Sequence, residues 1–163
     1  MRLNKSIIIL LLAAIVATGI SLATLVVTNN KSFDKDPEFY KSLGNQMVKE
    51  GKVDTAIKAY EASLALADDD NVRSNLAILY YQKGSYDNAI AHLRVLIAEA
   101  KLNPSYHYDL AVNLVDKFRN TEDKKLADLY EAVDEYKAAE QLSPGFLEAE
   151  NNINVLTKIL SGE

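Results

Sequence analysis

The hydrophobic and polar positions follow two different patterns along the chain. From Ile7 to Thr28 apolar residues predominate, and none of these 22 residues is charged. A helix of that length is about 33 Å long, enough for a hydrocarbon core of about 30 Å. In lipid such a helix satisfies its own backbone hydrogen bonds. Residues 7–28 are therefore predicted to form a transmembrane signal anchor.

The rest of the chain has the pattern of amphipathic helices. Apolar residues recur there at i, i+3, i+4 and i+7 spacing. Residues 29–36 are polar and aperiodic, which is typical of a short linker. We expect an all-α domain over residues 37–163. Its helices are predicted at residues 37–50, 54–67, 70–83, 87–101, 104–118, 124–142 and 145–160.

Local signals mark the ends of these helices. A side chain that can cap a helix precedes a proline at Asp36-Pro37, Asn103-Pro104 and Ser143-Pro144, and each pair predicts a helix start. Gly51 and Gly84 lie between successive helices, where a left-handed residue ends a helix without steric cost.

The helical region repeats at intervals of 33 and 34 residues. Matching positions recur in the runs Leu43-Gly44-x2-Met47-x3-Gly51-x4-Ala56-Ile57, Leu76-Ala77-x2-Tyr80-x3-Gly84-x4-Ala89-Ile90 and Leu110-Ala111-x2-Leu114. Periods of this size indicate stacked helical hairpins. Small residues recur where two helices would approach closely: Gly44, Ala56, Ala77, Ala89, Ala111 and Ala132.

These runs resemble the tetratricopeptide-repeat (TPR) family. The second unit matches the family pattern closely, whereas the first has Met47 where tyrosine is usual. In the third unit, the second half of the family pattern begins about nine residues later than expected, because residues are inserted around 118–125. The resemblance implies a right-handed α-solenoid of three TPR hairpins plus a C-terminal capping helix. The expected ranges are about 37–69, 70–103 and 104–144 for the repeats and 145–160 for the cap.

Charge and composition exclude several functions. Residues 29–163 carry 16 basic and 23 acidic side chains, which argues against nucleic acid as a partner. There is no cysteine, so disulfides, thiolate metal sites and a cysteine nucleophile are excluded. His92 and His107 are not spaced as a metal pair, and Asp68-Asp69-Asp70 suits a helix cap. We expect no cofactor, no metal, no small-molecule substrate and no enzymatic activity.

The N-terminal segment also predicts a location. Arg2 and Lys5 precede the apolar run, so residues 1–6 are expected in the cytoplasm and the repeats on the extracytoplasmic side, which is the periplasm in a bacterium. Gly19, Ser21 and Ala23 would allow close packing against other membrane helices. Cleavage at Ser21-Leu22-Ala23 is the alternative, and it would release a secreted domain.

The resemblance implies that the first helices of the hairpins line a concave groove for a protein or peptide partner. Val112 and Val115 have a second interpretation as core residues. Lys41, Asn45 and Asn75 match three positions of the family's clamp for a peptide carboxylate, but Ser105 and Asp109 replace its two basic residues, so no clamp is expected. The predicted groove residues are Lys41, Asn45, Val48, Ser74, Asn75, Ile78, Tyr81, Tyr108, Val112 and Val115.

Two functions are consistent with this pattern. One is a membrane-anchored scaffold or assembly factor that mediates protein–protein interaction at the extracytoplasmic surface. The other is an accessory single-span subunit of an integral membrane complex, in contact with lipid and with other subunits through residues 7–28.

Overall fold

The computed structural model describes residues 36–163, which form one compact unit. The predictions for the cytoplasmic terminus, the anchor, its packing residues Gly19, Ser21 and Ala23, and most of the linker lie outside this range. Within residues 36–163, no helix combines the length and the apolarity that crossing a membrane requires.

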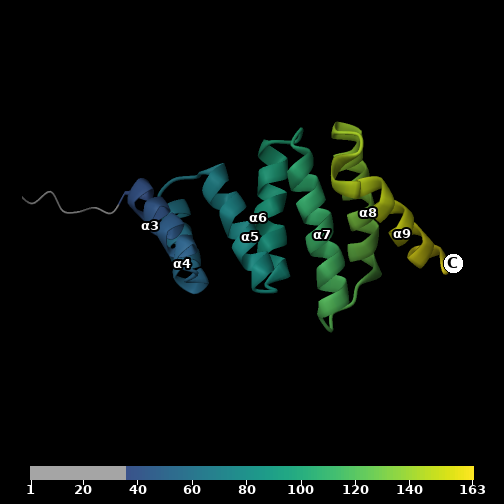
Figure 1. Ribbon diagram of the computed structural model, residues 1–163, viewed down its shortest axis with the longest axis horizontal. Helices are drawn as coiled ribbons and strands as arrows, with labels where there is room; N and C mark the ends of the chain where they lie inside the picture. Colours follow the sequence, from purple (N-terminus) through teal and green to yellow (C-terminus); the bar gives the residue numbers. More distant parts are fainter. Residues whose placement is uncertain (1–35) are drawn as a thin grey trace, which may run out of the picture. The chain divides into compact units, whose positions relative to one another are not determined.

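The described residues form three helical hairpins followed by a final helix. In Figure 1 the hairpins follow one another in chain order along the long axis of the domain, as expected for a solenoid. Each hairpin joins two long helices through a short loop. The elements are α3 (Pro37–Lys49), α4 (Val53–Leu64), α5 (Asp70–Gln82), α6 (Tyr86–Glu99), α7 (Pro104–Asn120), α8 (Leu126–Leu142), the 3-10 turn η1 (Phe146–Glu148) and α9 (Ala149–Ser161).

Capping explains where several of these helices begin. The carboxylate Oδ1 of Asp36 accepts a hydrogen bond from the Phe39 backbone N–H at 2.7 Å, and Asn103 caps α7 in the same way. Asp69, the middle residue of the acidic triplet, caps α5 through two backbone N–H groups. The capping predictions for α3, α5 and α7 are therefore confirmed.

Close helix approach depends on the small residues. Ala56, Ala89, Ala111 and Ala132 have no exposed surface. Gly44 lies against the ring of Tyr60, where a Cβ atom would come within 2.4 Å of Cε1. Gly51 and Gly84 both have left-handed backbone angles, with φ of 69° and 70°, and they end the first helix of their hairpins as predicted.

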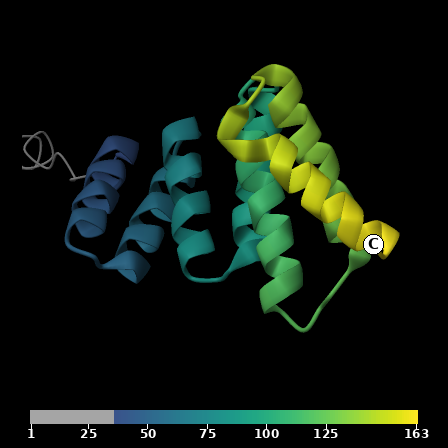
Figure 2. The ribbon, with the colours of Figure 1, turned by 45° about the vertical axis from the view of Figure 1, so that its right-hand side comes forward.

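The third hairpin is longer than the first two. Helices α7 and α8 have 17 residues each, whereas α3 to α6 have 12 to 14. The inserted residues therefore lengthen both helices as well as the connecting loop, which projects beyond the end of the stack in Figure 2. Lys117 ties the lengthened end to both neighbours, because its Nζ lies 3.0 Å from Asp87 and 3.4 Å from Asp128.

The C-terminal cap differs from the single helix predicted at residues 145–160. Ser143-Pro144 does not begin a helix: α8 ends there, Gly145 takes a left-handed conformation, and α9 starts only at Ala149. The ring of Phe146 packs edge-on against Tyr108, and Ala149 is fully buried. The chain therefore turns between these two contacts, and α9 then crosses α7 and α8 (Figure 2).

Candidate partner-binding groove

A pocket lies between α5 and α7, the first helices of the second and third hairpins. Three residues spaced i, i+4 and i+7 on α5 form one wall, namely Ser74, Ile78 and Tyr81. The facing wall comes from α7, and the pocket encloses about 180 Å³. Its remaining lining residues are Ala77, Leu93, Asp109, Val112 and Asn113. The structure thus brings together four of the residues predicted to line the groove: Ser74, Ile78, Tyr81 and Val112.

Ile78 and Tyr81 give the pocket its apolar and aromatic surface. Ile78 is 49% exposed, although it is a large apolar residue. The Tyr81 hydroxyl donates a hydrogen bond to Asp116 Oδ2 at 2.6 Å, and its ring packs edge-on against Tyr86. The hydrogen bond to Asp116, together with burial, raises the pKa of Tyr81 to about 12. Tyr81 is therefore held neutral and in one orientation, so a partner that contacts it has little side-chain entropy to remove.

Asp109 adds a carboxylate to this surface. Among the described residues its carboxyl group has no hydrogen bond and no ion pair, while its backbone carbonyl accepts from Asn113 Nδ2 at 2.8 Å. Water reaches Asp109, but protein surrounds it on several sides in the concave pocket, and this burial raises the pKa of its carboxyl to about 6. Asn113 is only 4% exposed, and its Oδ1 has no hydrogen-bond partner within residues 36–163.

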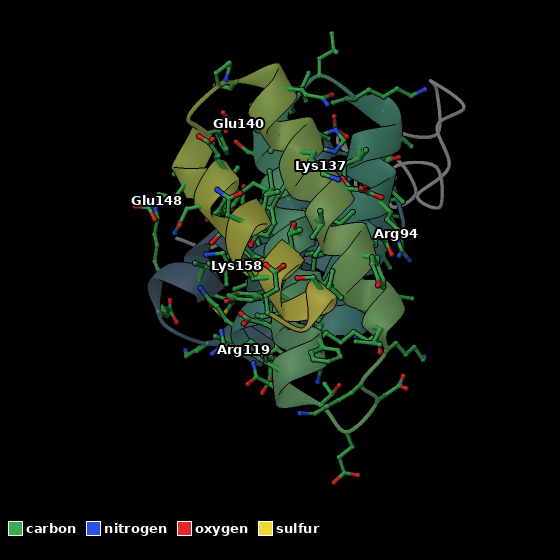
Figure 3. The ribbon with its side chains drawn as sticks, turned by 90° about the vertical axis from the view of Figure 1, so that its right-hand side faces the viewer. Arg94, Arg119, Lys137, Glu140, Glu148 and Lys158 are labelled. Carbon is green, nitrogen blue, oxygen red and sulfur yellow. The ribbon has the colours of Figure 1, made fainter. Side chains whose placement is uncertain are left out.

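A second cavity lies between α7, α8 and α9 and encloses about 470 Å³. Val155 and Ile159, spaced i, i+4 on α9, are 49% and 57% exposed at its edge. Figure 3 looks onto this end of the domain, with α9 in front and Arg119 near the end of α7. The cavity is lined by Val115, Phe118, Arg119, Leu129, Tyr136, Asn152, Val155, Leu156 and Ile159.

Residues 47–112 match the family model described as a tetratricopeptide repeat. Residues 47–112 therefore form tetratricopeptide repeats. No curated protein sequence matches it.

Solved structures of other TPR proteins share the fold. A structure of MamA from AMB-1 is 26% identical with a TM-score of 0.68, and the match covers 84% of this chain and 71% of that one. The first TPR domain of Spaghetti (RPAP3), bound to the HSP90 peptide SRMEEVD, is 20% identical with a TM-score of 0.63, covering 78% and 94%. TTC0263, a thermophilic TPR protein in Thermus thermophilus, is 21% identical with a TM-score of 0.59, covering 77% and 66%.

The clamp-like residues of the first TPR hairpin are engaged within the domain. Lys41 Nζ lies 2.9 Å from Asp69 Oδ2, and this hydrogen bond and charge raise the pKa of Lys41. The Tyr60 hydroxyl donates to Asn45 Oδ1 at 2.6 Å and accepts from Asn75 Nδ2 at 3.4 Å. These three side chains therefore help to hold α3, α4 and α5 together.

The other three predicted groove residues lie elsewhere. Val115 lines the second cavity, between α7, α8 and α9. Val48 is 42% exposed on α3, outside the α5–α7 pocket. Tyr108 packs edge-on against Tyr136 and Phe146, and its hydroxyl accepts a hydrogen bond from Asn152 at 3.3 Å. Tyr108 thus fixes the C-terminal cap and lines neither cavity. The i, i+4 apolar pair on α9 is the sequence signal that could have indicated the second cavity.

The titratable clusters of the described region offer no metal site. None of the residues in 36–163 forms a group of three or more His, Cys, Asp or Glu side chains that could hold an ion. His92 stacks on Tyr80, and His107 Nδ1 lies 2.6 Å from Glu135 Oε2. Both histidines join neighbouring helices, which is a structural role.

Proposed function

We propose that this TPR protein is held at a membrane by residues 7–28 and binds a partner protein segment in the α5–α7 groove. It would act as a scaffold or assembly factor on the extracytoplasmic side. The observation that supports the binding role best is the preformed pocket, in which Ile78 is half exposed and Tyr81 is fixed by Asp116. The bound HSP90 peptide in the RPAP3 structure supports a peptide as the kind of ligand.

The membrane part of the proposal rests on the sequence. The 22 uncharged residues from Ile7 to Thr28 suit a bilayer span, and Arg2 and Lys5 on their N-terminal side favour a cytoplasmic N-terminus. Because residues 36–163 contain no helix that could cross a membrane, attachment would depend on the preceding segment.

An accessory subunit of an integral membrane complex is the second candidate. The small residues Gly19, Ser21 and Ala23 favour it, because small side chains allow membrane helices to approach closely. Purification of the full chain in mild detergent separates the two candidates. A stoichiometric set of integral membrane proteins supports the subunit role, whereas a soluble or peripheral partner supports the scaffold role.

Ile78→Ala tests the groove. Burying the exposed half of an isoleucine contributes on the order of 1 kcal/mol, so we expect partner affinity to fall about fivefold. Leu126→Ala is a matched control, because Leu126 is 59% exposed at the start of α8 and lies outside both cavities. Equal binding by a folded Ile78→Ala protein and by wild type would contradict the groove assignment.

Membrane extraction tests the anchor. The mature chain should remain with membranes after a high-salt wash and dissolve only in detergent, with its N-terminal residues intact. A mature chain that is soluble without detergent and begins near Ala23 or Thr24 would instead identify a secreted TPR domain.

A further inference from the structure

The α5–α7 pocket contains two hydrogen-bond acceptors without donors. The Asp109 carboxyl has no partner among the described residues, and neither does the buried Asn113 Oδ1. Both residues line the same pocket, and Asn113 lies one helical turn after Asp109 on α7. Buried polar atoms in native proteins nearly always have a partner, so the unpaired Asn113 Oδ1 calls for an explanation, whereas the Asp109 carboxyl is open to solvent and free to pair with an incoming group.

The charged residue that lines the pocket, Asp109, is acidic. Asp116, seven residues after Asp109 on α7, is a second carboxylate near this face; it accepts the hydrogen bond of Tyr81 and lies 3.9 Å from Arg119 Nη1. No lysine, arginine or histidine lines the pocket. Negative charge in a concave site attracts cations from solution, because the surrounding protein focuses the field.

The size of the pocket limits what can enter it. Sites for drug-sized ligands usually have about 300–1,000 Å³, whereas this pocket encloses about 180 Å³. That space suits one long side chain. Lysine and arginine bury their aliphatic stems along apolar surface and keep the charged end beside polar groups. Here Ile78 and Val112 supply the apolar surface, and Asp109 supplies the acceptor for the charged end.

We propose that the α5–α7 pocket receives a lysine or arginine side chain from a partner protein segment whose neighbouring residues are apolar. Asp109 pairs with the cation, and the apolar neighbours cover Ile78. This inference rests on the proposed function, since it names the chemistry of the segment that would occupy the groove. The proposed ligand differs in charge from the acidic peptide SRMEEVD bound by RPAP3, because Asp109 would repel an acidic peptide.

A display selection identifies the preferred ligand even while the natural partner is unidentified. The full chain in mild detergent is panned with a library of random peptides, and enriched peptides are synthesised with each basic residue intact or replaced by methionine. Fluorescence anisotropy then measures their binding to wild type, to Asp109→Asn and to Asp134→Asn. Asp134 is an exposed carboxylate on α8, so its variant makes the same change of net charge outside the α5–α7 pocket.

The proposal predicts enrichment of peptides with a basic residue between apolar ones. A hydrogen-bonded charge pair contributes about 1.5–3 kcal/mol, so Asp109→Asn should weaken binding roughly tenfold to a hundredfold, while Asp134→Asn changes it little. Replacing the basic residue of the peptide by methionine should lower its affinity for wild type by a similar factor. The same replacement should hardly change its affinity for Asp109→Asn, because two groups that pair directly are energetically coupled. Asparagine is nearly isosteric with aspartate, and the backbone carbonyl that Asn113 uses remains.

Two results would overturn the proposal in different ways. Selected peptides whose binding depends on Ile78, but which are not enriched in basic residues and are not affected by Asp109→Asn, would refute the cation site. The proposed partner groove would still be supported. Peptides that bind independently of both Ile78 and Asp109, or a selection that enriches no peptide, would refute the groove assignment as well. Binding of free arginine as tightly as of the selected peptides would assign the pocket to a small cation instead of a protein segment.

Discussion

Gly44→Ala tests how tightly the first hairpin is packed. Gly44 on α3 faces the ring of Tyr60 on α4, and an added Cβ would lie 2.4 Å from Cε1 and 2.5 Å from Cδ1. Ordinary van der Waals contacts begin at about 3.4 Å, so the ring and the helix would have to separate by roughly 1 Å. Tyr60 cannot yield easily, because it is only 1% exposed and its hydroxyl is hydrogen-bonded to Asn45.

The expected change in the free energy of unfolding is the sum of two opposing effects. Alanine is better than glycine in a helix by about 1 kcal/mol, which favours the variant. Overpacking a filled core costs about 1–3 kcal/mol, and an overlap of two ring carbons belongs in the upper part of that range. We therefore expect Gly44→Ala to lower the free energy of unfolding by about 2 kcal/mol and Tm by roughly 5–10 °C.

Thermal unfolding followed by circular dichroism at 222 nm measures this effect. Ser42→Ala is the control, since Ser42 is exposed on the same helix and should tolerate alanine without loss. A second substitution, Tyr60→Leu, should reduce the cost of alanine at position 44, because the overlapping ring is gone. Unfolding of Gly44→Ala at or above the wild-type temperature would show that the hairpin is not close-packed at this point.

Three further predictions concern polar contacts of the domain. Lys117→Met should lower the free energy of unfolding in urea by about 2–3 kcal/mol, because Asp128, which is 8% exposed, loses its counter-ion. An unfolding midpoint equal to that of wild type would contradict this. Tyr60→Phe should cost about 1 kcal/mol by the same assay, since it removes the hydrogen bond to Asn45, and an unchanged midpoint would show that bond to be dispensable. The pKa of Asp109 is about 6 in the folded chain and near 3.8 unfolded, so the folded state binds more protons between these values and wild-type stability should fall as pH rises from 4 to 6. Asp109→Asn should remove that decline and melt above wild type at pH 7; identical pH profiles would be evidence against the shifted pKa.

A more stable Asp109→Asn protein would itself support a binding role. An unpaired carboxylate in a concave pocket weakens the folded state, and natural proteins retain such groups chiefly where they act on a ligand. Stability and peptide affinity should therefore change in opposite directions at this position. At an exposed site such as Asp134 both quantities should stay nearly constant.

Most of the helical architecture could be predicted from the sequence because its signals are local. Capping by Asp36 and Asn103, the left-handed glycines and the repeat period each depend on residues close in the chain, and the predicted helices agree with α3 to α8 within about four residues. The start of α9 could not be predicted in this way. It depends on long-range contacts, in which Phe146 packs on Tyr108 and Ala149 is buried, and these override the Ser-Pro start signal.

The groove was predictable only in part for the same reason. Helical spacing correctly placed Ser74, Ile78 and Tyr81 on one face of α5. Spacing alone could not show that the cap would cover Tyr108, because the covering residues lie in a different element. The unpaired acceptors of Asp109 and Asn113 also required the structure, since satisfaction of a polar group depends on every neighbour in space.

Site-specific photo-crosslinking in cells shows whether a partner occupies the α5–α7 groove. A photoreactive phenylalanine analogue is introduced at Ile78 in the groove or, separately, at Ala91, an exposed position of α6 outside both cavities. Cells expressing each full-length variant are irradiated, and crosslinked species are identified by mass spectrometry. We expect a discrete partner adduct from position 78 and none from position 91. An adduct formed from position 91 alone, or with equal yield from both positions, would be incompatible with partner binding in the groove.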